Sequence, residues 1–232
     1  TAPDVLLGRV PAAIRDRLEK IWPQLVASLL DSLRTDGAVT LGCDEWDENY
    51  SDGDYQGIGK WFSLDEGFGS ALIALSGKTN EHRRNAFVWR VLREVEQPPL
   101  EWSVGEPVVR DVFSELFEQL HGKASDQQGG WSWLKAGQRE SEAGNTMALR
   151  IDFSELALRR PAGLFRCEKT GQVWPRAVEG DAPATVELHL QEITPDKLDK
   201  DLRIGRLRQE LQTSPVFSIG LWGEEHSAQL SP

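Results

Sequence analysis

Pro11-Ala-Ala-Ile-Arg-Asp-Arg-Leu-Glu-Lys-Ile-Trp-Pro-Gln-Leu-Val-Ala-Ser-Leu-Leu-Asp-Ser-Leu-Arg34 is the stretch that decides the fold of the N-terminal part of this chain. Its apolar residues recur at intervals of three and four, the period of one helix face: Ile14, Leu18, Ile21, Leu25, Leu29, Leu30 and Leu33. Pro23 removes a backbone donor from the middle, so one kinked helix or two helices are expected. Asp36-Gly37 marks the end of this helical segment.

The residues after this helix predict two short strands separated by an acidic loop. Ala38-Val-Thr-Leu-Gly42 and Lys60-Trp-Phe-Ser-Leu64 have the composition of strands. Between them, Asp44 to Asp54 carries six carboxylates and no basic residue, which indicates an exposed loop. The order helix, strand, acidic tip and strand is compatible with a small winged-helix-type unit.

Two further helices and a hairpin are expected in the middle of the chain. Residues 80–95 predict a helix that buries Ala86, Phe87, Val91 and Val95 and directs Arg83, Arg84, Arg90 and Arg93 outward. Residues 107–120 predict another helix, opened by Pro107. Trp131-Ser-Trp-Leu134 and Ala148-Leu-Arg-Ile-Asp-Phe153 are strand-like and predict a wing hairpin.

The last third predicts a small β subdomain. Leu164-Phe-Arg-Cys-Glu-Lys-Thr-Gly-Gln-Val-Trp174 has two apolar-alternating arms around a Gly-containing turn, as in a hairpin. The whole sequence therefore predicts an α+β fold: winged-helix-like helical units followed by a small β subdomain and a terminal strand. The expected units are residues 1–78, 79–160 and 161–232.

The charge of the chain is negative overall but unevenly distributed. A formal net charge of −11 over 232 residues argues against a dedicated nucleic-acid-binding protein, because phosphate contacts need cationic side chains. From Arg150 to Arg176, however, six basic residues face three acidic ones. A partner within a Debye length of roughly 10 Å responds to this local sign rather than to the total.

Cysteine usage and hydropathy limit the setting of the chain. Cys43 and Cys167 are far apart and do not make a disulfide framework or the four ligands of a structural zinc site. No apolar run reaches the ~20 residues that span a bilayer, and no signal-peptide pattern opens the chain. We therefore expect a cytoplasmic protein without a membrane partner.

The motifs that suggest catalysis are incomplete. Ser76-Gly-Lys-Thr79 resembles the end of a phosphate-binding loop, but the required upstream glycine position is Leu72. Asp44-Glu-Trp-Asp47 resembles a magnesium-binding strand end, but it precedes that loop instead of following it, and the acidic run fails the register of a calcium loop. The four His residues are scattered. No catalytic residue, metal site or cofactor site is therefore expected in this chain.

One segment combines basic and aromatic residues in a pattern typical of nucleic-acid-binding surfaces. It contains Phe165, Arg166, Lys169, Trp174 and Arg176. The same composition also suits a solvated face above a Trp anchor. Both interpretations remain open from the sequence.

The C-terminal stretch Val216-Phe-Ser-Ile-Gly-Leu-Trp-Gly-Glu-Glu-His-Ser-Ala-Gln-Leu-Ser-Pro232 reads as a buried strand, a turn and a helix start. Ser231 suits an N-cap and Pro232 the first helical position, so we expect the chain to be part of a larger protein. This stretch, together with Leu164 to Arg176 and Arg206-Leu-Arg-Gln-Glu-Leu211, resembles very large bacterial superfamily-2 helicases of the DEAD/DEAH type. These helicases are associated with phage-defence islands such as Druantia.

The resemblance implies that the chain is a non-catalytic accessory region leading into the second motor lobe. The parent protein would use ATP and magnesium, and the partners would be the remaining helicase lobes and single-stranded or duplex DNA. Arg166, Lys169, Arg176 and His226 would contact phosphates, and Trp174 would pack or stack. The alternative is an acidic protein–protein docking module without nucleic-acid binding, which the Asp44 to Asp54 run favours.

Overall fold

A computed structural model describes residues 1–40, 59–64, 72–77, 82–93, 101–126, 130–141, 144–156, 163–167, 173–179, 182, 190–194, 196–197 and 200. These residues form a mixed α+β fold with two small sheets, so the predicted class is confirmed. The helices are α1 (Asp4–Arg9), α2 (Ala12–Thr35), α4 (Arg83–Arg93) and α5 (Trp102–Ser125). None of the helices described is long and apolar enough to span a membrane.

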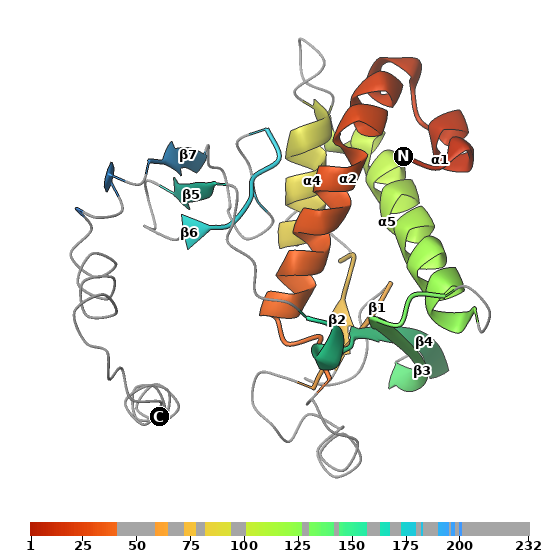
Figure 1. The fold of residues 1–232 in the computed structure, drawn as a ribbon. Coiled ribbons are helices and arrows are strands. Elements are labelled where there is room, and N and C mark those ends of the chain that lie inside the picture. Colours follow the sequence, from red (N-terminus) through yellow and green to blue (C-terminus); the bar gives the residue numbers. More distant parts are fainter. Residues whose placement is uncertain are drawn as a thin grey trace, which may run out of the picture.

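Helices α2, α4 and α5 run side by side, with a four-stranded sheet across their lower ends in Figure 1. The sheet has the order β2-β1-β4-β3 and contains β1 (Trp61–Ser63), β2 (Leu72–Ala74), β3 (Leu134–Ser141) and β4 (Gly144–Ile151). Strands β1 and β2 are parallel, whereas β4 is antiparallel to both β1 and β3. One sheet therefore combines strands from the segments 1–78 and 79–160, and the main core extends across residue 78.

Helix α2 is a single helix that continues through Pro23. Its apolar stripe is buried as the spacing predicted, and Ile14, Leu18, Leu25, Leu29 and Leu33 are fully inaccessible to solvent. Burial of such a continuous stripe outweighs the one backbone hydrogen bond that proline removes.

The end of α2 agrees with the Asp36-Gly37 signal. The amide of Gly37 donates to the carbonyl of Arg34, and the amide of Ala38 donates to the carbonyl of Leu33. Gly37 has φ +91°, and these two bonds are those of a Schellman motif. The motif turns the chain into Val39, which forms a parallel bridge with Ile151 of β4.

Two predictions about the middle helices were wrong. Helix α5 begins at Trp102, so Pro107 lies inside it. In α4, Arg84 and Arg90 are buried rather than outward, at 1% and 9% exposure. Arg84 donates to Ser32 Oγ at 2.8 Å and to the Ala74 carbonyl at 2.9 Å, and it also pairs with Asp36.

The Arg84 contacts connect α2, β2 and α4, because each of its partners lies on or directly after one of these elements. A buried guanidinium is tolerated only when its donors are satisfied, as they are here. Burial, together with the charge of Arg83, lowers the pKa of Arg84 to about 9.

The expected hairpin arms at 131–134 and 148–153 were only partly right, because the first strand begins at Leu134 and the second ends at Ile151. The ladder of the β3–β4 hairpin runs from the Leu134–Ile151 pair to the Ser141–Gly144 pair. Leu134, Leu149 and Ile151 on one face join the helices in the main core. Strand β1 adds Phe62 to this core, where its ring lies edge-on to Phe117 of α5, with the ring centroids 6.4 Å apart.

The second sheet has the order β6-β5-β7 and contains β5 (Leu164–Cys167), β6 (Val173–Trp174) and β7 (Leu190–Ile193). The predicted pairing of the two arms around residue 170 is confirmed by the Phe165–Trp174 and Arg166–Val173 pairs. The segment after β6 contacts the helical part: Val178 is buried in the main core, and Glu179 pairs with Arg17 of α2.

Candidate nucleic-acid interface

The second sheet separates the aromatic and basic residues that the sequence placed together. Directly opposed residues of an antiparallel pair lie on the same face, and neighbours along a strand lie on opposite faces. Trp174 is opposite Phe165, whereas Arg166 is opposite Val173. Arg166 is therefore exposed on one face of this sheet and Trp174 lies on the other.

Trp174 packs within a small hydrophobic cluster. Its ring contacts the cluster formed by the buried residues Cys167, Ala182 and Leu190, together with Phe165. Cys167 is buried and forms no disulfide within the described part of the chain. This packing corresponds to the Trp-anchor interpretation of the segment.

Arg176 contacts an acidic residue of α2. Its Nε lies 2.9 Å from Oδ2 of Asp31, whose other carboxylate oxygen lies 3.3 Å from Nε of Arg34. Arg176 therefore helps to hold the second sheet against α2, although its side chain remains 49% exposed. Lys169 and His226 lie outside the described residues.

A second basic and aromatic surface lies on the four-stranded sheet, on the face opposite the helices. We call it the Trp61 face. The β1–β4 register pairs Phe62 with Leu149, so Trp61 lies opposite Arg150, and Lys135 of β3 is paired with Arg150 on the other side. The Trp61 face consists of Trp61, Leu72, Lys135, Gly137, Arg139, Ala148 and Arg150.

Two guanidinium groups stack on the indole at the centre of this face. The Cζ atoms of Arg139 and Arg150 lie 4.1 and 4.3 Å from the ring centroid of Trp61. Relative to the Gly137–Ala148 pair, Arg139 lies nearer the turn of the β3–β4 hairpin and Arg150 lies nearer its open end. The two guanidinium groups therefore approach the ring from opposite directions. Each such contact contributes about 0.5–2 kcal/mol, more when the cation is desolvated.

Small residues beneath the indole make this arrangement possible. A Cβ at Gly137 would lie 2.9 Å from Cη2 of Trp61, so a larger residue would displace the ring. Ala148, opposite Gly137, is fully buried beside Trp61. The indole therefore extends from β1 across β4 towards β3, and its position orders both arginines.

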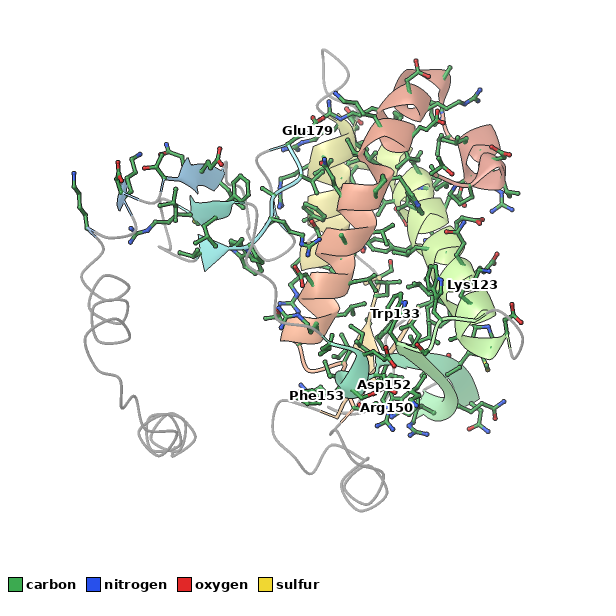
Figure 2. The ribbon with its side chains drawn as sticks, viewed as in Figure 1. Lys123, Trp133, Arg150, Asp152, Phe153 and Glu179 are labelled. Atoms are coloured by element: carbon green, nitrogen blue, oxygen red, sulfur yellow. The ribbon has the colours of Figure 1, made fainter. Side chains whose placement is uncertain are left out.

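Among the described side chains of the Trp61 face and Asp152 beside it, basic groups outnumber carboxylates. Lys135 lies 2.8 Å from Oδ2 of Asp152 and remains 53% exposed. Arg139 donates to the carbonyl of its neighbour Gln138 at 2.8 Å, and no carboxylate pairs with it among the described residues. Three cations and one carboxylate thus lie near one another at the base and middle of the hairpin, and Figure 2 labels Arg150 and Asp152 there.

The Asp152 carboxylate stays ionised. Burial raises its pKa, but hydrogen bonds from Lys135 and Ser154 outweigh this effect, so the net pKa is lowered. The Ser154 amide and hydroxyl donate to Oδ1 at 3.0 and 2.7 Å, which caps the 3₁₀ turn Phe153–Glu155. Asp152 therefore fixes the position of Lys135.

The Ser76-Gly77 turn is stabilised from within the chain. Asn85 of α4 accepts from the Gly77 amide at 3.3 Å and from the Ser76 hydroxyl at 3.2 Å, and its Nδ2 donates to the Gly77 carbonyl at 2.7 Å. The Gly77 amide that a phosphate would need is already bonded. Within the described ranges, no three His, Cys, Asp or Glu side chains are close enough together to hold a metal ion.

Sequence reasoning missed the Trp61 face because its parts are distant in the chain. Hairpin alternation places Lys135 and Arg139 on one face, since they are four residues apart on a strand. The contribution of β1 was not visible, because the Phe62–Leu149 pairing joins segments on either side of two helices.

Comparisons of the chain with protein-family models, with curated proteins and with solved structures found no match.

Proposed function

We propose that this chain is a non-catalytic accessory region of an ATP-dependent DNA helicase, and that it holds nucleic acid on the Trp61 face. The helicase setting is supported by the sequence resemblance of the last third of the chain. The binding role is supported by the Trp61 face, where Arg139 and Arg150 stack on one indole beside Lys135.

The stacked arginines carry this proposal. Arg139 has a guanidinium that pairs with no carboxylate in the described part of the chain, and such a cation can contact a phosphate. Arg150 is only 8% exposed, so its charge acts from beneath the surface while Lys135 and Arg139 present theirs. Stacking also restricts the side-chain motion of the arginines, which lowers the entropy lost on binding.

The arrangement of cations on this sheet face suits a nucleic-acid strand better than a small ligand. Lys135 and Arg139 lie four residues apart on β3, and Arg150 lies on β4 opposite Lys135. A small molecule is normally enclosed in a concave pocket, whereas a polyanion follows a row of separated positive charges. No reaction is assigned to this face.

Affinity for labelled single-stranded and duplex oligonucleotides, measured by fluorescence anisotropy, tests the proposal. Between about 50 and 200 mM salt, the affinity should fall as a power of the salt concentration. Arg139→Gln should weaken binding and reduce the slope by about 0.7 for a single strand, because one phosphate contact is lost.

Arg110→Gln is the matched control. Arg110 lies on α5, is 72% exposed and pairs with Glu106 at 2.9 Å, so this substitution removes the same charge away from the Trp61 face. Arg166→Gln and Arg176→Gln test the surface predicted from the sequence. Equal affinity of the Arg139 variant and the wild type would remove the Trp61 face from the proposal, and the absence of any oligonucleotide binding would favour the acidic docking module.

A further inference from the structure

An exposed tryptophan stack lies at the base of the same hairpin. The rings of Trp131 and Trp133 are nearly parallel, with centroids 5.1 Å apart and an interplanar angle of 21°. Trp133 is partly buried against the main core, whereas Trp131 is 41% exposed. A large aromatic surface is therefore held outward by a ring beneath it.

The backbone around the stack is fixed at several points. The Trp131 amide donates to the carbonyl of Lys123 at the end of α5, and the Leu134 amide donates to the carbonyl of Trp131. The Trp133 carbonyl accepts from the Asp152 amide at 2.8 Å. A surface tryptophan held in this way loses little conformational entropy when a second ring stacks on it.

The charges near the stack are mixed. Lys123 is exposed on α5 and Lys135 follows the stack on β3, but the acidic Asp126 also lies beside the turn, where its carbonyl accepts from Gly130. Attraction of phosphate alone would not favour this position. A base suits it better, because its ring can stack on Trp131 while the phosphates on either side of it approach Lys123 and Lys135.

We infer that Trp131 is a stacking platform for an unpaired base, so that the nucleic acid bound by this chain is single-stranded. This inference rests on the proposed function and adds the substrate class. An aromatic side chain stacks on any exposed base without reading its sequence. In a duplex, the base faces are already stacked on each other and cannot reach Trp131.

The test compares Trp131→Ala, Trp131→Phe and the wild-type chain for binding to a short oligothymidylate and to a duplex. Stacking predicts a loss of about 5- to 150-fold in single-strand affinity for the alanine variant, from the 1–3 kcal/mol that one stacked base contributes. Phenylalanine retains a ring and should stay within about threefold of the wild type. Duplex affinity should be the same for all three proteins, and circular dichroism checks that the exposed substitution leaves the fold intact.

Two results would overturn the inference. One is a single-strand affinity of Trp131→Ala equal to that of the wild type while Arg139→Gln is weakened; the proposed function would then stand and the platform would not. The other is an equal loss for single strand and duplex, which would show that Trp131 does not contact an unpaired base. If the wild type binds neither oligonucleotide, both the proposed function and this inference are wrong.

Discussion

Gly105 of α5 lies against the indole of Trp89 on α4, and this contact sets how closely the two helices approach. A Cβ built on Gly105 would overlap the Cζ3 and Cη2 atoms of Trp89. Trp89 is 6% exposed, and its ring is held edge-on to Trp102 at 5.9 Å. The Trp89 ring therefore cannot move aside easily when Gly105 is replaced by alanine.

The expected magnitude follows from two opposing effects. Alanine favours a helix over glycine by about 1 kcal/mol, whereas overpacking a rigid core site costs about 1–3 kcal/mol. Because the overlap at Gly105 involves ring atoms, the upper part of that range applies, and Gly105→Ala should destabilise the fold by about 1–2 kcal/mol. Gly122 lies in the same helix with nothing within 4 Å of its Cβ position, so Gly122→Ala should stabilise by about 0.5 kcal/mol.

Urea unfolding followed by circular dichroism measures both variants against the wild type. With an m-value of about 2–3 kcal/mol/M, a difference of about 2 kcal/mol separates the two midpoints by close to 1 M. Gly105→Ala should have the lower midpoint. Equal midpoints, or a more stable Gly105→Ala protein, would refute the α4–α5 packing that supports the four-stranded sheet.

Three further predictions concern buried or strained charges. Arg84→Met should lower the free energy of unfolding by about 3 kcal/mol, because it removes a buried, hydrogen-bonded guanidinium. Arg83→Met, at a half-exposed site, should lower it by less than about 1 kcal/mol. Similar urea midpoints for the two variants would contradict the contacts of Arg84 with Ser32, Ala74 and Asp36. The pKa of Asp152 is lowered in the folded chain, so its ionised form stabilises the fold above the unfolded pKa of about 3.9, and this stability is lost as pH falls through the native pKa. The difference in melting temperature between the wild type and Asp152→Asn should therefore disappear below about pH 4. A difference that stays constant with pH would contradict this. Glu179 has φ +49° and pairs with Arg17. Both Glu179→Ala and Glu179→Gly lose the ion pair, but only glycine removes the backbone strain of about 1 kcal/mol. The glycine variant should therefore melt at a higher temperature than the alanine variant.

The parts of the fold that local patterns determine were predictable from the sequence. The three-and-four spacing predicted the buried stripe of α2, and Gly37 predicted its end, because both depend on neighbouring residues. The arms of the β5–β6 hairpin were also recognised from alternation. For the β3–β4 hairpin, the expected arms at 131–134 and 148–153 only overlap the ends of the observed strands. The winged-helix arrangement remains a prediction.

The parts that depend on distant partners were not predictable. Arg84 looked like a surface residue because its apolar neighbours fill one helix stripe, yet its acceptor Ser32 lies 52 residues away. The candidate site has the same character. Trp61, Arg139 and Arg150 come together only through the β1–β4 pairing, which no local spacing specifies.

Ultraviolet cross-linking of the purified chain to a single-stranded oligonucleotide, followed by peptide mass spectrometry, tests the central claim most directly. Contact with the Trp61 face predicts cross-links on the peptides that contain Trp61 and residues 134–151, and their loss in Arg139→Gln but not in Arg110→Gln. Cross-links confined to residues 164–176, or present equally in both variants, would contradict it.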